Sequence, residues 1–162
     1  MAFERHAWSR LSHLQVGRFA EHYVAMEFAL YGAEVYTPLV DDRGIDLVIR
    51  LNGGFLEVQV KALRWPSSTY IFFRKDVFPL SPTRYAAVVL LEELKEPALY
   101  LIPALAWREP HGPFKSRDYV GRASPPEWGL DITKRARPAL DAFRFDRQII
   151  TLIAPAPEVQ PA

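Results

Sequence analysis

The stretch Ile45–Ala62, IDLVIRLNGGFLEVQVKA, is the strongest signal of the fold in this sequence. It holds two runs rich in valine, isoleucine and leucine, Ile45–Leu51 and Phe55–Ala62, which flank the tripeptide Asn-Gly-Gly at positions 52–54. Such runs favour strands, and an Asn-Gly pair accepts the positive φ angles that a tight two-residue turn requires. The stretch therefore predicts an antiparallel β-hairpin.

Alternation along the two strands separates an apolar face from a polar one, because side chains two residues apart point to the same side. The polar face carries a carboxylate, an amide and a lysine, contributed by Asp46, Gln59 and Lys61. The aliphatic side chains share the opposite face: Ile45, Leu47, Ile49, Leu51, Leu56, Val58, Val60 and Ala62.

The turn determines which polar residues are neighbours. If residues 52 and 53 form the loop, Asp46 lies directly opposite Gln59; if residues 53 and 54 form it, Asp46 faces Lys61. A three-residue loop would mix the two faces, so the hydrophobic pattern disfavours it. Both remaining registers bring the three polar side chains together at the end of the hairpin away from the turn.

Two interpretations of this cluster remain open from the residues alone. The polar face is either the solvated side of an edge hairpin, with Asp46 and Lys61 in a weak surface ion pair, or a covered face. A covered carboxylate needs a partner such as a metal ion or a lysine. Asp46, Gln59 and Lys61 would then suit phosphodiester hydrolysis, since Mg²⁺ takes oxygen ligands and a lysine can orient the attacking water or neutralise developing charge.

Outside the hairpin the sequence predicts an amphipathic helix over Leu14–Tyr31, with apolar residues three and four apart and Gly32 as its stop. Trp107 and Trp128 are interpreted as packing anchors. The other expected elements are strands at Ala33–Leu39, Tyr70–Phe73, Ala86–Leu91 and Leu99–Ile102, a turn at 41–44, a short helical turn at Ser81–Arg84 and a helix between Thr133 and Phe143.

The ordered set GRFAE (17–21), a helix ending at Gly32, GIDLV (44–48), the Asn-Gly turn and VQVK (58–61) resembles the PD-(D/E)XK nuclease superfamily. The resemblance is closest to archaeal Holliday-junction resolvases and related small restriction-like nucleases, and it covers residues 17–63. It implies an α/β (α+β) fold of the restriction-endonuclease type, in which a central mixed sheet with a central hairpin is flanked by helices.

The resemblance also implies roles for four residues. Asp46 and Gln59 would bind Mg²⁺ or Mn²⁺, Glu21 would reach the metal directly or through water, and Lys61 would serve the attacking water. The family usually has an acidic residue at the position of Gln59, so one negative charge is lost here. Glu57 shares the face of Gln59 and is expected to be exposed or ion-paired rather than a ligand.

Composition limits the remaining possibilities. The chain of 162 residues fits one domain, expected over residues 1–153, with a flexible tail at 154–162. It has no cysteine, no apolar run long enough for a membrane helix and no signal-peptide layout, which suits a cytoplasmic protein. The net charge of +1 does not indicate which class of partner the protein binds.

These observations predict a metal-dependent endonuclease that acts on DNA. Phosphate contacts are assigned to Arg5, Arg10, Arg18, Arg64 and Lys75. A two-fold homodimer would suit the cutting of both strands of a duplex. The alternative is a nuclease-like fold that binds nucleic acid or a protein without cutting, which Gln59 favours, and a third reading is a purely structural or interaction domain.

Overall fold

The computed structural model describes residues 4–40 and 42–154. Except for Ala154, the tail expected at 154–162 lies outside the described residues. The elements follow one another as η1 (Trp8–Arg10), α1 (His13–Leu30), β1 (Glu34–Tyr36), β2 (Leu47–Leu51), β3 (Gly54–Trp65), β4 (Tyr70–Arg74), β5 (Arg84–Glu92), β6 (Ala98–Pro103), η2 (Ala104–Trp107), β7 (Phe114–Arg117), β8 (Glu127–Asp131), η3 (Arg137–Phe143) and α2 (Phe145–Ile153), where η marks a 3₁₀ helix.

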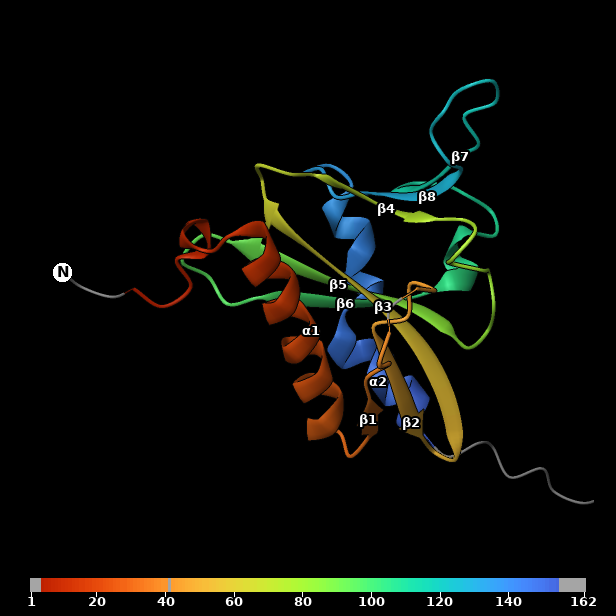
Figure 1. The fold of residues 1–162 in the computed structure, drawn as a ribbon. Helices are drawn as coiled ribbons and strands as arrows, with labels where there is room; N and C mark the ends of the chain where they lie inside the picture. The colour runs from red at the N-terminus through yellow and green to blue at the C-terminus, as the bar shows by residue number, and fades with distance from the viewer. Residues whose placement is uncertain (1–3, 41, 155–162) are drawn as a thin grey trace, which may run out of the picture.

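A central mixed sheet of five strands, ordered β1-β2-β3-β5-β6, carries the fold (Figure 1). Strands β3 and β5 are parallel, and the other neighbouring pairs are antiparallel. Helices α1 and α2 pack into one apolar core on one face of this sheet. A second core on the other face holds the small antiparallel sheet β4-β8-β7 together with η2 and η3. The sheet is thus covered on both faces, as its apolar strands require.

The hairpin forms in the first of the two predicted registers. Leu51 pairs with Gly54 and Leu47 with Val58, so residues 52 and 53 are the loop, with φ angles of 49° and 76°. The alternative loop at residues 53 and 54 is therefore wrong. The predicted apolar face is confirmed, because the buried Ile49 and Val58 belong to the core beneath α1.

Helix α1 confirms its prediction to within a residue at each end. It begins with a capping box, in which Ser12 accepts a hydrogen bond from the Gln15 backbone and the Gln15 side chain accepts one from the Ser12 backbone. Gly32 follows its end with a φ of 82°, a conformation that favours glycine. The buried residues recur every four positions and face the sheet: Val16, Ala20, Val24 and Phe28.

Strand β3 is much longer than its partner in the hairpin. Strand β2 pairs with residues 54–58 of β3, whereas β5 pairs with residues 57–65. In the described part of the chain, the remaining stretch of β3 therefore has one edge that no strand covers. Because that edge starts where Asp46 lies, it positions the candidate site.

The second half of the chain departs from prediction in several places. The expected helical turn at Ser81–Arg84 is a plain turn, because Arg84 already belongs to β5. The expected helix at Thr133–Phe143 is a 3₁₀ helix over Arg137–Phe143, with Pro138 near its start, where no hydrogen-bond donor is needed. Strands β7 and β8 and helix α2 were not predicted.

Both tryptophans act as packing anchors, as predicted. Trp107 is fully buried and its indole donates to the Gly129 carbonyl, and the partly buried Trp128 donates to the Phe78 carbonyl. Within residues 4–40 and 42–154 no helix is long and apolar enough to span a membrane.

Candidate active site

Asp46 is fixed at the end of the hairpin by two hydrogen bonds to β3. Its backbone amide donates to the Val58 carbonyl at 3.0 Å, and its Oδ2 accepts from the Val60 backbone amide at 2.6 Å. The carboxylate therefore stands where β2 would have continued its pairing with β3. The ladder itself ends at Leu47 and Val58, and the Asp46 amide bonds to Val58 rather than to Gln59, so the direct pairing of Asp46 with Gln59 stays a prediction.

Gln59 is buried, with 8% of its surface exposed, and its Oε1 accepts no hydrogen bond from the described residues. Gly44 packs over its amide: a Cβ at Gly44 would lie 3.0 Å from Gln59 Nε2, and the Gly44 φ of 63° favours glycine. Leaving a buried polar atom unpaired costs about 1–3 kcal/mol. Such an unpaired buried oxygen needs an explanation, and a bound cation is one.

Glu21 and Asp46 line the same pocket, of about 310 Å³, between α1 and the segment that leads into β2. Helix α1 and the segment before β2 thus contribute one carboxylate each to this pocket. Glu21 is half-buried and accepts a hydrogen bond from Arg18 at 2.6 Å. The pair is largely solvated, so it contributes little to stability.

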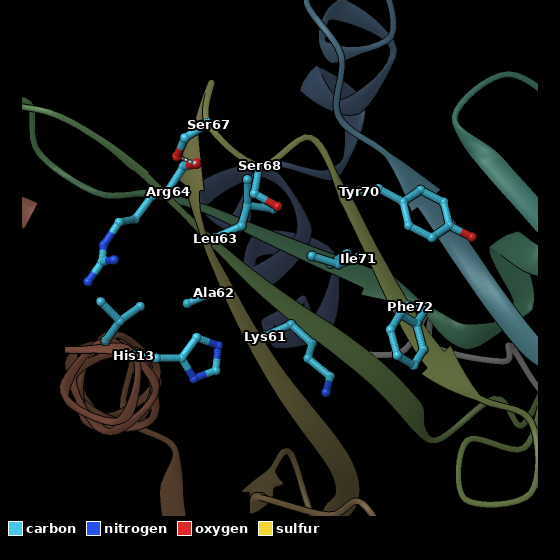
Figure 2. Close-up of a pocket in the computed structure, with 11 residues that line it drawn as sticks. His13, Lys61, Ala62, Leu63, Arg64, Ser67, Ser68, Tyr70, Ile71 and Phe72 are labelled. Carbon is cyan, nitrogen blue, oxygen red and sulfur yellow. Dashed lines mark hydrogen bonds between the residues drawn. The ribbon is translucent and has the colours of Figure 1, made fainter. Parts of the chain in front are cut away.

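Lys61 lines a second pocket, of about 330 Å³ (Figure 2). It lies on the same face of β3 as Gln59, two residues further along. A third, shallow hollow along α1 shares His13 with the pocket of Lys61, and it shares Arg18 and Glu21 with the pocket of Asp46. We refer to these three hollows together as the depression along α1; Asp46 lines one of them and Lys61 another.

Arg84 is a part of this site that the sequence analysis missed. It is 2% exposed and donates to Glu57 Oε2 at 3.2 Å, to the Arg43 carbonyl at 3.0 Å and to the Val77 carbonyl. Burial lowers the pKa of its guanidinium, while the charges of Glu57 and Asp46 act in the opposite direction. A single arginine at the head of an otherwise apolar strand was the available signal, since a buried arginine demands partners. Glu57 is ion-paired, as predicted.

The five predicted phosphate contacts fall in different places. Arg18 and Arg64 line the depression, and the Arg64 guanidinium also donates to the Leu11 carbonyl. Arg5 and Arg10 are exposed near the start of α1. Lys75 donates to Asp118 at 2.5 Å and lies over the Trp128 ring, so its charge is already compensated by the second sheet.

A divalent metal ion needs several ligating side chains at one place. In the part of the chain that the structure describes, no group of three or more His, Cys, Asp or Glu side chains is placed to hold a metal. The carboxylates of Asp46 and Glu21 line one pocket, and Gln59 is not among the residues that line it. Carboxylate and amide oxygens, with water completing the shell, are ligands that suit a hard cation such as Mg²⁺ or Mn²⁺, so the side-chain chemistry of the three residues fits such an ion.

Neither a protein-family model nor a curated protein sequence matches this chain. Among solved structures, it is similar to the bacterial homing endonuclease I-Ssp6803I, with 22% identity and a TM-score of 0.53 over 86% of this chain and 91% of that one. It also matches Hjc, a Holliday junction resolvase from Archaeoglobus fulgidus, with 15% identity and a TM-score of 0.49 over 76% and 88% of the two chains. The helix, hairpin and mixed sheet described above therefore form a restriction-endonuclease-like fold.

Proposed function

We propose that this protein is a metal-dependent endonuclease that hydrolyses DNA phosphodiester bonds. One observation carries the proposal: Asp46 and Glu21 line one pocket, and the buried Gln59 on β3 has an Oε1 that accepts no hydrogen bond from the described residues. A buried polar oxygen without a partner is rare and needs an explanation, and a cation supplies one. The fold supports the same class of activity.

Asp46, Gln59 and Glu21 would hold the Mg²⁺ or Mn²⁺ ion. When bound, such an ion polarises the phosphoryl group and lowers the pKa of a coordinated water. The hydrogen bond from the Val60 amide fixes the orientation of the Asp46 carboxylate before any ligand arrives. Lys61, in another hollow of the depression, contributes a positive charge that binds phosphate oxygens and offsets the charge that develops during hydrolysis.

The ion pair between Arg18 and Glu21 has two functions in this proposal. It holds the Glu21 carboxylate at the rim of the pocket. Both partners are solvated, so the pair is weak and can exchange. With Glu21 as a ligand of the ion, the Arg18 guanidinium would be available to a phosphate of the DNA backbone.

The test is cleavage of supercoiled plasmid and of a synthetic four-way junction with Mg²⁺, with Mn²⁺ or with EDTA. We expect cleavage with either metal and none with EDTA. Lys61→Ala and Asp46→Asn should each reduce the rate by roughly 100-fold or more. The exposed residues Lys134 and Asp141 supply matched controls, since Lys134→Ala and Asp141→Asn should cut at the wild-type rate. Cleavage that survives EDTA, or that persists in both site variants, would contradict the proposal.

A second candidate function is a nuclease-fold protein that binds nucleic acid or a protein partner without cutting. Two observations favour it: position 59 has an amide in place of the usual carboxylate, and Glu21 is already ion-paired with Arg18. The same assay separates the two functions. Salt-sensitive binding of the junction without cleavage under any metal condition would select this alternative.

A further inference from the structure

The pocket that contains Lys61 has features that the proposed metal chemistry does not use. It lies at the edge of β3 that no described strand covers, between the start of α1 and strand β4 (Figure 2). We call it the edge pocket. Its walls come from three elements and the loop at Ser67 and Ser68. Its lining residues are His13, Val16, Lys61, Ala62, Leu63, Arg64, Ser67, Ser68, Tyr70, Ile71 and Phe72.

The polar part of the edge pocket suits an anion. Lys61 and Arg64 carry positive charge, His13 and the two serines can donate hydrogen bonds, and none of the described carboxylates lines the pocket. The pocket of Asp46, by contrast, contains two carboxylates. The charge within the depression therefore changes from negative in the hollow of Asp46 to positive in the hollow of Lys61, as a phosphodiester strand next to a metal site requires.

The apolar part of the edge pocket offers an aromatic surface. Phe72 is 47% exposed because the alternation of β4 turns Ile71 and Phe73 into the core and Phe72 outwards. Figure 2 shows the Lys61 side chain between the His13 ring on the α1 side and the Phe72 ring on β4. Tyr70 forms a fixed wall beside them, since its hydroxyl donates to Glu127 at 2.8 Å. An exposed aromatic ring next to cationic side chains is the arrangement on which unpaired bases stack.

The size of the edge pocket restricts its occupant. A volume of about 330 Å³ is near the lower end of the roughly 300–1,000 Å³ of small-molecule pockets, so it admits one nucleotide and not a duplex. A base inside a duplex has both faces stacked and its pairing edge occupied, so it reaches such a pocket only when it is unpaired or turned out of the helix.

We propose that the edge pocket receives one unpaired nucleotide of a DNA strand, with its base against Phe72 and its phosphate at Lys61, Arg64 and His13. This inference rests on the proposed nuclease function and names its substrate class: DNA that carries an unpaired nucleotide beside the bond to be cut. Phe72 is the residue that distinguishes this class, whereas the cationic side chains bind any strand.

The experiment measures binding, with no cleavage required. Fluorescence anisotropy in EDTA gives the Kd for three labelled DNAs: a fully paired duplex, the same duplex with one extra unpaired thymidine, and that duplex with an abasic sugar at the unpaired position. The proteins are the wild type, Phe72→Ala, Phe72→Tyr and the control Phe55→Ala, which removes a ring that is 54% exposed and lies outside the edge pocket.

The wild type should bind the duplex with the unpaired thymidine most tightly. Phe72→Ala should weaken that one complex by roughly 5- to 150-fold, the range for loss of one base–aromatic stack, and leave the other two unchanged. Removing the base should cost the wild type the same factor and cost Phe72→Ala nothing, because both changes delete the same interaction. Phe72→Tyr should retain the preference, and Phe55→Ala should behave as the wild type.

The inference is overturned if Phe72→Ala leaves all three Kd values unchanged, or if it weakens all three equally. Either result would leave the nuclease proposal intact, because that proposal depends on cleavage with metal and on Asp46 and Lys61. If the wild type binds none of the three DNAs even at low salt, the inference also fails, whereas the nuclease proposal is decided by cleavage with metal.

Discussion

Replacing Arg84 with methionine removes a buried charge while nearly keeping the volume of the side chain. Arg84 ties together three segments that are distant in sequence: it donates to the carbonyl of Arg43 just before Asp46, to the carbonyl of Val77 before β5 and to Glu57 on β3. The methionine variant would lose all three hydrogen bonds. The variant would also no longer bury an ion. This raises the free energy of unfolding by several kcal/mol and opposes the loss of the hydrogen bonds.

The sizes of these effects predict the sign of the outcome. Each hydrogen bond from the charged guanidinium to a carbonyl contributes about 1.5–3 kcal/mol. Glu57 is 45% exposed, so it is rehydrated when its partner is lost and its ion pair contributes at most about 1 kcal/mol. After subtraction of the relieved burial, we expect Arg84→Met to lower the free energy of unfolding by about 2 kcal/mol. For a chain of this size that corresponds to a fall in Tm of about 4–8 °C.

Calorimetry gives the Tm, and hydrogen exchange shows where the loss occurs. The Asp46 amide, which donates to Val58, should exchange faster in Arg84→Met, because the segment before Asp46 has lost its attachment. Arg84→Lys keeps the charge but cannot reach all three acceptors, so its Tm should be intermediate. An unchanged or higher Tm in the methionine variant would refute this reasoning, since it would show that burial of the ion outweighs its hydrogen bonds.

Two further substitutions test the site from other directions. Gln59→Glu adds a carboxylate to the proposed metal ligands. Its Tm should therefore fall below that of the wild type in EDTA and rise above it in excess Mn²⁺, with roughly tenfold tighter metal binding by calorimetric titration. A metal response equal to that of the wild type would remove this position from the site. Gly44→Ala should lower the Tm of the protein more than Gly53→Ala does. Both glycines have a positive φ (63° and 76°), but only at Gly44 would the new Cβ make a close contact, 3.0 Å from the Gln59 amide. The left-handed backbone alone costs about 1–2 kcal/mol, so equal losses in the two alanine variants would mean that the Gln59 amide yields freely.

The first half of the fold was predictable because its signals are local. The Asn-Gly turn and the alternation of the strands narrow the hairpin to two registers, and the structure has the one with residues 52 and 53 as the loop. The recurrence of apolar side chains three and four residues apart, with Gly32 as the stop, gave α1. The long apolar runs gave β5 and β6, because buried strands in a mixed sheet need no alternation.

The second half was harder because its elements depend on tertiary contacts. Strands β7 and β8 have only four and five residues, and Gly129 interrupts the second. Helix α2 has nine residues and no side-chain cap, and it forms by packing Phe145 and Ile149 into the core of α1. The partners of Arg84 and Lys75 lie in loops and on the second sheet, so no spacing rule could have indicated them.

The Val60 amide, which bonds to the Asp46 carboxylate, lies on the edge of β3 where β2 has ended. A row of unpaired backbone groups on such an edge is a template for pairing with another chain. The carboxylate interrupts that row at its first position, so Asp46 also protects the sheet from edge-to-edge association. Under the proposed function, selection against aggregation and selection for a metal ligand would act on the same carboxylate, and a chain without catalysis would still have reason to keep this aspartate.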